Sequence, residues 1–248
     1  MKRNLEAEVS QLVLTGGPKK VTDLALEVGV SGVTIRKVLS SLEGKGVLRR
    51  FHGEARAFDS DEIPFRMGDR FQQKTAIAKT AAALVEAGDT ILLEAGSTVS
   101  ILAELLKDMH NLTVITPNLY VARLFRRTKV SVIVLGGLYQ EASESFVGSI
   151  AKNALAELAF SKAFLGVTGF TRLTGFTLND ALRAEVTQTI LARGAKNFIL
   201  ADSSKFGVTH LAPICPGPGL IQTVITDGGL PDEDGAFLEA SGITVLKV

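Results

Sequence analysis

The sequence contains little of what secreted, membrane-spanning or disulfide-stabilised proteins need. Only one of its 248 residues is a cysteine, Cys215, which excludes an internal disulfide and a cysteine-rich metal site. No apolar run approaches the roughly 18 residues of a membrane-spanning helix, and the first ten residues, MKRNLEAEVS, lack the apolar centre of a secretory signal. We therefore expect a cytoplasmic protein with no membrane partner.

Signatures of catalysis and of metal binding are also scarce. His110 and His210 stand alone, and the chain contains no Walker-type or zinc-protease motif. We expect neither a metal nor a cofactor. The content of 46% hydrophobic and 21% charged residues is typical of a globular protein with one large and one small domain.

Charge is distributed unevenly along the chain. Residues 1–58 hold ten Lys or Arg against six Asp or Glu, a net charge of +4, so with +1 overall the remainder carries −3. A basic head on a mildly acidic body indicates that the head meets a polyanion.

The head has the pattern of a winged helix-turn-helix domain. Helical spacing of apolar residues predicts helices over 5–14, over 20–29 with Gly29 as the stop, and over 31–44 with Ser31 as N-cap. In the third helix Val33, Ile35 or Val38, Leu39 and Leu42 form the expected inward stripe. The stretch VLRRFHGEARAF then predicts a hairpin around residues 52–53.

The third helix is the expected recognition helix. Arg36 can make bidentate bonds to guanine, Thr34 can meet a thymine methyl or a phosphate, and Lys37 can neutralise backbone charge. Arg56 would join the wing residues on the flanking backbone. The predicted DNA-binding residues are Ser31, Thr34, Arg36, Lys37, Arg49, Arg50 and His52. The alternative is a small docking domain with a solvated basic face.

Residues 59–69, which are acidic and contain Pro64, predict a linker, and residues 70–248 predict an α/β domain. After a helix in RFQQKTAIAKTAAALVEAG come seven apolar runs: TILLE, LTVIT, VSVIVL, AFLGV, NFILA, TVIT and ITVLKV. Because helix-compatible segments separate most of these runs, we expect a mainly parallel sheet covered on both faces.

Several of the expected strands end in small or polar residues. In TILLEAGSTVSILAELL, Gly96 lets the backbone approach a ligand, and Ser97 and Thr98 offer hydroxyls beside the free N–H groups of a helix N-terminus. TPN, LGG, VTGF and ADSSK follow other runs. Since the carboxyl ends of parallel strands line the ligand crevice, these loops should converge.

The head resembles the N-terminal domain of the DeoR family of bacterial transcription regulators. The resemblance is carried by the valine-serine turn at residues 30–31, by TIR at residues 34–36 and by the arginine-histidine-glycine wing. Val38 stands where the family usually has aspartate, and Glu54 where a second glycine is usual.

The body resembles the effector-binding domain of the same family. The matching stretches are GST at 96–98, LGG at 135–137, SESFVG at 143–148, AFLG at 163–166, TGFT at 174–177, AEV at 184–186, DSSKFG at 202–207 and ITDGG at 225–229. The resemblance implies a fold related to ribose-5-phosphate isomerase and CoA transferases, and a repressor released by a phosphorylated sugar or sugar alcohol. Four positions depart from the family pattern, namely Glu94, Val99, Pro117 and Thr187, the last standing where a lysine is often found.

From these features we expect a DNA-binding repressor of sugar or sugar-alcohol metabolism that is not an enzyme and acts as a homodimer or homotetramer. Its partners would be operator DNA and a small sugar or polyol phosphate. The predicted effector-binding residues are Gly96, Ser97, Thr98, Asn118, Gly136, Gly137, Glu185, Asp202, Ser203 and Lys205. The alternative is an isomerase-like enzyme that uses Asp202, Glu185 and Lys205 for proton transfer.

Overall fold

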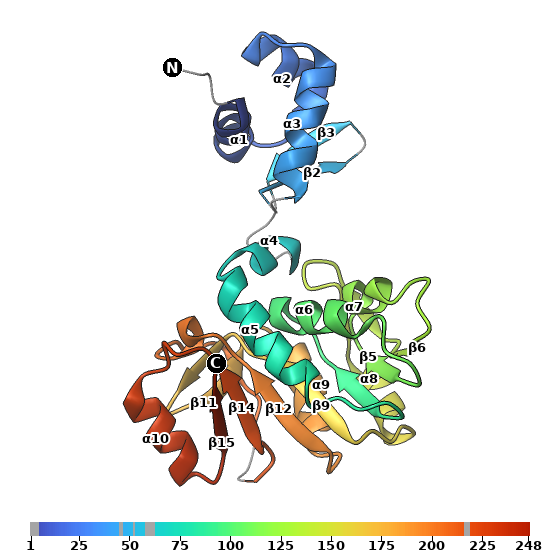
Figure 1. The fold of residues 1–248 in the computed structure, drawn as a ribbon, viewed down its shortest axis with the longest axis vertical. Helices are drawn as coiled ribbons and strands as arrows, with labels where there is room; N and C mark the ends of the chain where they lie inside the picture. The colour runs from blue at the N-terminus through green and yellow to red at the C-terminus, as the bar shows by residue number, and fades with distance from the viewer. Residues whose placement is uncertain (1–4, 45–46, 52, 58–62, 216–218) are drawn as a thin grey trace. The chain divides into compact units, whose positions relative to one another are not determined.

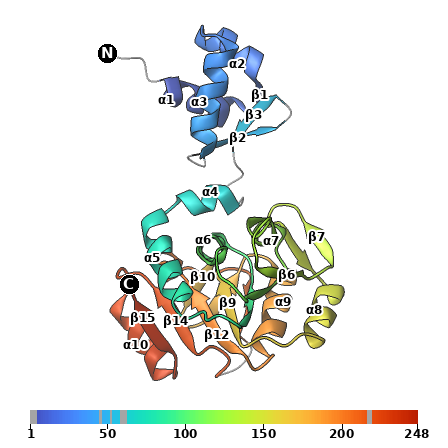
Figure 2. The ribbon, with the colours of Figure 1, turned by 45° about the vertical axis from the view of Figure 1, so that its right-hand side comes forward.

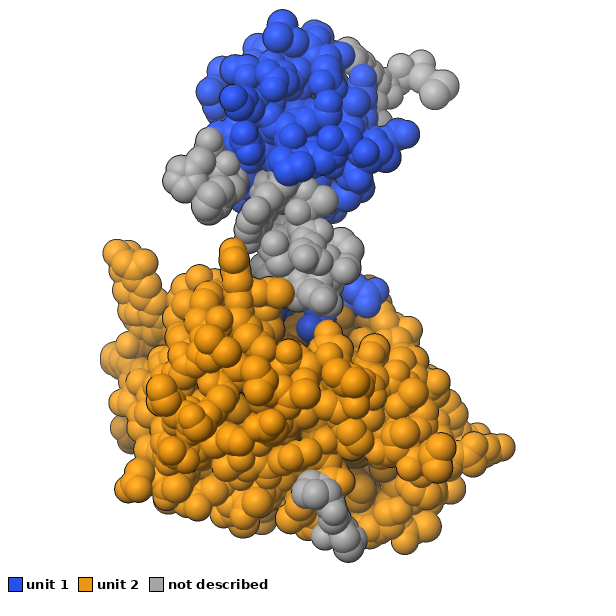
Figure 3. All heavy atoms as spheres, turned by 180° about the vertical axis from the view of Figure 1, so that it is seen from behind, with its two compact units in different colours: residues 1–69 blue, residues 70–248 orange. Residues whose placement is uncertain are grey.

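The computed structural model describes residues 5–44, 47–51, 53–57, 63–215 and 219–248. Figure 1 shows the fold, Figure 2 shows it after a turn of 45°, and Figure 3 colours its two compact units, Met1–Asp69 and Arg70–Val248. None of the described helices is long and apolar enough to cross a membrane.

Unit 1 contains the three helices and the hairpin that the sequence predicts. Its helices are α1 (Leu5–Gly16), α2 (Val21–Val28) and α3 (Gly32–Gly44), and the antiparallel strands β2 (Leu48–Phe51) and β3 (Glu54–Ala57) form the wing. Leu24, Ile35, Leu39 and Leu48 are fully buried in one apolar cluster, so the hairpin is packed against the helices.

Three features of unit 1 differ from the expectation. A short strand β1 (Lys19–Lys20) pairs with β3 and makes the wing three-stranded. The sequence predicts that Val33 faces inward, but it is 62% exposed, because Ile35, Leu39 and Leu42 fill the inner face of α3 without it. Part of the expected linker is helical, as α4 (Ile63–Gly68); Pro64 fits there because the first turn of a helix does not need its N–H.

The seven apolar runs form the seven strands of one parallel sheet in unit 2, which confirms the expected fold class. They are β4 (Thr90–Leu93), β5 (Thr113–Thr116), β6 (Ser131–Val134), β9 (Lys162–Gly166), β12 (Lys196–Leu200), β14 (Thr223–Thr226) and β15 (Thr244–Lys247). Their order is β15-β14-β12-β9-β4-β5-β6, and every neighbouring pair is parallel. All seven carboxyl ends therefore lie along one edge, called here the carboxyl edge.

Helices cover both faces of this sheet (Figures 1 and 2). On one face lie α5 (Phe71–Ala82), α6 (Ser97–Leu106) and α7 (Leu119–Leu124), and on the other α8 (Ser149–Ala156) and α9 (Ala181–Leu191); α10 (Asp232–Ala240) packs beside β15. Buried aromatic rings reinforce neighbouring strands, as Phe164 of β9 stacks on Phe198 of β12 at 5.0 Å between centroids.

Two small antiparallel pieces complete unit 2. Strands β7 (Leu138–Gln140) and β8 (Ser145–Val147) form a hairpin, and β10 (Gly169–Thr171), β11 (Gly175–Leu178) and β13 (Ala212–Pro213) form a three-stranded sheet. The sequence does not predict them, because strands of two to four residues are too short to show a clear period.

Candidate nucleic-acid interface and effector site

The first turn of α3 presents a mixed basic and apolar surface. Ser31 caps the helix, since its Oγ accepts a hydrogen bond from the Thr34 N–H at 3.1 Å and lies 2.9 Å from the Thr34 Oγ1. Arg36 and Lys37 are exposed beside Val33, and no ion pair joins either of them to another described residue. This face offers two cations and one apolar side chain to a partner, which suits base edges, thymine methyls and phosphates.

The wing is tied to this helix through Arg50. Its backbone N–H and its Nε both donate to Glu43 of α3, at 3.1 and 2.9 Å. Arg50 therefore positions the hairpin and is not free as a phosphate contact in this arrangement. The Arg49 and Arg56 side chains and all of His52 lie outside the described residues.

In unit 2, glycines bring the ends of β4 and β9 close together. Gly96 has a φ of +127°, and a Cβ added to Gly166 would lie 2.6 Å from the Ala95 carbonyl oxygen. Since no side chain could occupy that space, only glycine permits this approach at Gly166. The result is that the N-terminus of α6 begins at the carboxyl edge.

The N-terminus of α6 has no side-chain cap. Its N-cap residue is Gly96, which cannot provide one. Ser97 and Thr98 follow, 5% and 6% exposed, and neither hydroxyl makes a hydrogen bond to another described residue. Uncapped N–H groups beside buried hydroxyls can bind an anion.

A buried ion pair lies next to this helix start. Arg183, in the first turn of α9, places its Nη2 3.2 Å from Oε1 of Glu94, which directly follows β4, and the two side chains are 6% and 3% exposed. The Arg183 Nε, the Glu94 Oε2 and the Thr187 Oγ1 are buried with no hydrogen-bond partner among the described residues. Buried polar atoms are normally hydrogen-bonded, so these three atoms mark a site with unused bonding capacity.

Arg183 is not among the effector-binding residues that the sequence predicts. Glu94 and Thr187 depart from the family pattern, but their positions in the sequence do not link them to an arginine. The signal was present, because residues 183, 187 and 190 share one helix face and Ile190 is apolar. That spacing predicts that Arg183 faces inward.

Asn118 and Gly137, the second glycine after β6, have structural roles at the same edge. The Asn118 side chain caps α7 by accepting from the Val121 N–H at 3.0 Å, and its Nδ2 donates to the Ser143 carbonyl at 2.8 Å and to the Ser145 hydroxyl at 3.1 Å. A Cβ on Gly137 would lie 2.6 Å from the carbonyl oxygen of residue 147, while Gly136 has open space around it. Asn118 and Gly137 therefore hold the β7–β8 hairpin against the sheet, whereas Gly136 makes no close contact of this kind.

The stretch after β12 is engaged with Arg70, the first residue of unit 2. The Arg70 Nε lies 3.2 Å from Oδ1 of the buried Asp202, and its Nη2 donates to the Ser203 hydroxyl at 2.7 Å. Oδ1 of Asp202 also accepts from the Ser204 backbone and hydroxyl. Lys205 closes the short helix η1 (Ser203–Lys205), is half-buried, and forms no ion pair with a described residue.

Asp227, at the end of β14, belongs to the same cluster. Burial would raise its pKa, but hydrogen bonds from the Ser203 N–H and hydroxyl and from the Gly229 N–H, together with Arg70, bring the pKa below its ordinary value. Asp227 is therefore held as a carboxylate.

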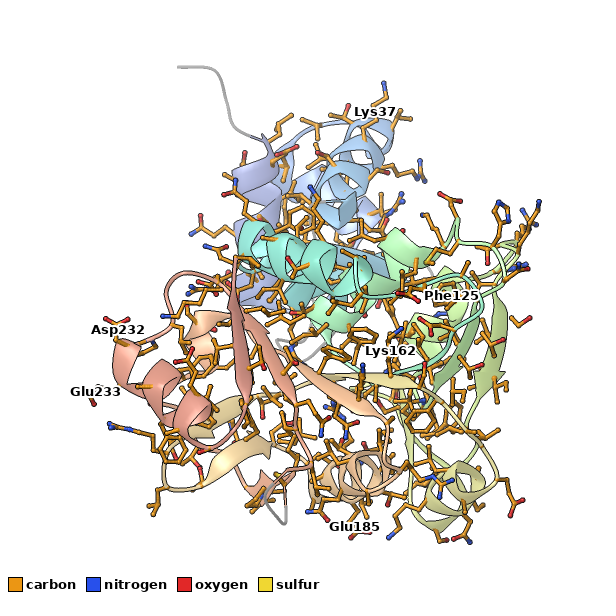
Figure 4. All side chains as sticks on the ribbon, turned by 60° about the horizontal axis from the view of Figure 1, so that its bottom comes forward. Lys37, Phe125, Lys162, Glu185, Asp232 and Glu233 are labelled. Carbon is orange, nitrogen blue, oxygen red and sulfur yellow. The ribbon has the colours of Figure 1, made fainter. Side chains whose placement is uncertain are left out.

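Glu185 lies apart from the other predicted effector residues. Its side chain is 48% exposed and pairs with Lys152 of α8 at 2.6 Å. Figure 4 shows it on the side of α9 that faces away from the sheet. Among the described residues, no group of three or more His, Cys, Asp or Glu side chains is arranged to hold a metal ion.

Solved structures give a distant likeness only. Ribose-5-phosphate isomerase A of Methanocaldococcus jannaschii has a TM-score of 0.41 at 18% identity over 55% of each chain. The β subunit of eIF2B from Chaetomium thermophilum has a TM-score of 0.45 at 14% identity, over 89% of this chain and 76% of that one.

Sequence comparisons are more specific. The chain is 35% identical to the lactose phosphotransferase system repressor of Staphylococcus epidermidis over 84% of this chain and 85% of that protein. It is 35% identical to the HTH-type transcriptional regulator GolR of Listeria innocua over 84% and 83% of the two chains, and 28% identical to IolR of Bacillus subtilis over 91% of each. Residues 6–61 match the family model of the DeoR-like helix-turn-helix domain, and residues 69–228 match that of the DeoR C terminal sensor domain. With both models matched in the order that the sequence predicted, the chain belongs to the DeoR family of transcriptional regulators.

Proposed function

We propose that this protein is a cytoplasmic, homo-oligomeric repressor of sugar or sugar-alcohol metabolism genes, and that a small phosphorylated sugar or polyol at the carboxyl edge controls its affinity for operator DNA. The observation that carries the proposal is the uncapped N-terminus of α6 beside the buried Glu94–Arg183 pair. The names of the relatives, which include a lactose phosphotransferase system repressor, support a carbohydrate-derived effector.

The bonding groups at this edge fit two parts of such a ligand. The N–H groups of α6, with the Ser97 and Thr98 hydroxyls, suit a phosphate. The unpartnered atoms of Glu94 and Thr187 suit sugar hydroxyls, and Arg183 supplies a buried cation one helical turn before the position where related chains often have lysine. Lys205 remains a candidate second cation, from the carboxyl end of β12.

An enzymatic role is less well supported. General acid–base catalysis needs a carboxylate that can reach the proton it moves. Asp202 is already bonded to Arg70 and Ser204, and Glu185 is on the surface with Lys152. We infer that the site binds its ligand without transforming it.

Arg70 provides a route by which the site can be coupled to the head. An effector changes the affinity for DNA only if it binds two conformations of the protein with different affinities. Arg70 directly follows unit 1, has a φ of +51°, a strained value for a non-glycine residue, and holds Asp202 and Ser203. A ligand that competes for these two side chains would release Arg70 and relax the backbone at the start of unit 2.

The experiment is a fluorescence-anisotropy titration of the protein on DNA upstream of its own gene, at fixed salt, with phosphorylated and unphosphorylated sugars and polyols. We expect at least one phosphorylated compound to weaken DNA binding. Ser97→Ala and Lys205→Ala should bind DNA normally and lose this response.

The matched controls are Ser149→Ala and Lys152→Ala, which should respond like the wild type. Ser149 also begins a helix after a glycine N-cap but is exposed, and Lys152 is a surface lysine. A normal response in both Ser97→Ala and Lys205→Ala would disprove the proposed site, and failure to bind the DNA at all would disprove the regulator.

A further inference from the structure

Strand β6 is an open edge of the sheet with apolar side chains exposed on both faces. Its sequence from Ser131 to Val134 contains no charge and no proline, and Ile133 and Val134 are 39% and 42% exposed. Because successive side chains point to opposite faces, neither face is fully covered. The apolar surface continues into β7, where Leu138 is 61% and Tyr139 42% exposed.

The opposite edge of the same sheet is protected. Strand β15 begins with exposed Thr244 and ends with exposed Lys247, whose Nζ lies 3.6 Å from Asp232. A lysine on an edge strand prevents pairing with another chain, and an apolar edge without such a device invites it. The contrast makes β6 the edge that is open to pairing with another strand.

The backbone of β6 is ready to accept that strand. The Ser131 N–H donates to the Leu112 carbonyl at 3.0 Å and the Leu135 N–H to the Thr116 carbonyl at 2.9 Å, so these groups point toward β5. Backbone groups alternate in direction along a strand, and those of Val132 and Val134 therefore point outward from the sheet.

We propose that β6 pairs antiparallel with β6 of a second copy of this chain, joining two sheets into one. In the register that uses the outward groups, Val132 of each copy exchanges two N–H···O bonds with Val134 of the other. Ile133 then lies on the two-fold axis opposite Ile133 of the second copy. A closed two-fold dimer of this kind has a self-complementary interface.

Charges at the two ends of β6 favour the antiparallel arrangement. The strand is preceded by three exposed basic residues, Arg126, Arg127 and Lys129. Exposed Glu141 lies in the turn after β7, which follows the carboxyl end of β6. Antiparallel pairing brings the basic end of each copy toward the acidic end of the other. Parallel pairing would place the basic ends together.

Cysteine cross-linking tests the register. In a chain with Cys215→Ser, Ile133→Cys would face its own copy at a non-hydrogen-bonded position, where Cα atoms are about 4.5 Å apart and a disulfide can form. Mild oxidation should convert most of this variant to a covalent dimer on non-reducing gels. The control, Thr244→Cys on β15, should remain monomeric on the same gel.

Light scattering after size exclusion tests the interface without a thiol. Val134→Lys should halve the mass of the wild type and weaken self-association roughly tenfold or more, because a charge enters a buried strand pair. Its far-UV circular dichroism should match that of the wild type, since residue 134 is already partly exposed, and Thr244→Lys should keep the wild-type mass.

A monomeric wild type, an unchanged mass for Val134→Lys, or cross-linking of Ile133→Cys no faster than that of Thr244→Cys would overturn the inference. The inference names the surface for the self-association included in the proposed function. None of these measurements uses DNA or effector, so a failure here is distinguishable from a failure of the regulator itself.

Discussion

The Glu94–Arg183 pair makes the most direct prediction about the site. Replacing Arg183 with Met keeps the aliphatic length and removes the guanidinium, which leaves the Glu94 carboxylate buried without its counter-ion. Breaking one side of a buried pair costs about 3–5 kcal/mol. The melting temperature of a domain of 150–250 residues falls by roughly 2–4 °C for each kcal/mol of lost stability, so we expect a fall of about 6–20 °C. The double variant Glu94→Gln/Arg183→Met removes both charges and should recover most of that loss.

The assay is thermal and urea unfolding of unit 2 within the full chain, followed by circular dichroism. Arg172→Met is the control, because Arg172 is 53% exposed and its nearer ion-pair partner, Glu233, is 77% exposed. Its loss should cost less than about 1 kcal/mol. If Arg183→Met were no more destabilising than Arg172→Met, or if the double variant were as unstable as the single one, the pair would not be desolvated and the reasoning would fail.

Three further predictions concern the head and the Asp227 cluster. Arg36→Ala should weaken operator binding by about 1–3 kcal/mol and relax base preference, measured by anisotropy on operator and scrambled DNA; an unchanged preference would contradict the recognition-helix assignment. Glu43→Gln should release Arg50 and remove a negative charge, so binding to all DNA sequences should strengthen and depend more steeply on salt. Weaker binding would mean that DNA binding needs the contact between Glu43 and Arg50. Ser203→Ala should raise the pKa of Asp227 toward its ordinary value. Because the pKa of Asp227 is lowered in the folded state, the stabilisation from its carboxylate is present above about pH 4 and is lost as pH falls through the folded-state pKa. Acid unfolding of the variant should therefore begin at higher pH. An unchanged acid midpoint would show that Ser203 does not hold the carboxylate.

The sheet was predictable from sequence because buried parallel strands are nearly continuous apolar runs. All seven such runs became strands of one sheet, and the polar residues after them fell on the carboxyl edge. The recognition helix was equally predictable from the sequence, apart from Val33. Because Val33 is apolar, the sequence pattern assigns it wrongly to the core. A surface that contacts DNA can present an apolar side chain, and composition alone does not separate that case from burial.

The candidate site was harder to predict because side-chain direction decides it. Glu185 and Arg183 are two residues apart on α9, so they point to different sides of the helix. Charged residues on helices are usually solvated, which made Arg183 inconspicuous. Asp202 and Ser203 were correctly placed at the end of a strand, but their engagement with Arg70 depends on a contact across more than a hundred residues, and no local pattern reports such a contact.

The amino ends of the same strands show what a purely structural polar cluster looks like in this protein. Asp89 precedes β4 and accepts hydrogen bonds from the Lys162 Nζ at 2.6 Å, the Glu86 N–H at 2.8 Å and the Ser161 hydroxyl at 3.1 Å. Burial would raise its pKa, but these bonds lower it. Asn197, also near an amino end, donates twice through Nδ2, although its Oδ1 has no partner among the described residues.

The carboxyl edge carries more such atoms, since buried atoms of Glu94, Arg183 and Thr226 there, and of Thr187 further along α9, lack a hydrogen-bond partner within the described part of the chain. An unsatisfied buried polar atom destabilises the folded state by about 1–3 kcal/mol. The same strands run through both edges, so the sheet itself does not require unsatisfied atoms at one edge. A bound polyol phosphate would satisfy several of these atoms at once, and the binding free energy gained there is available to shift the equilibrium between two states. The uneven hydrogen bonding of the two edges therefore supports the proposal that the effector binds at the carboxyl edge, independently of any resemblance to other chains.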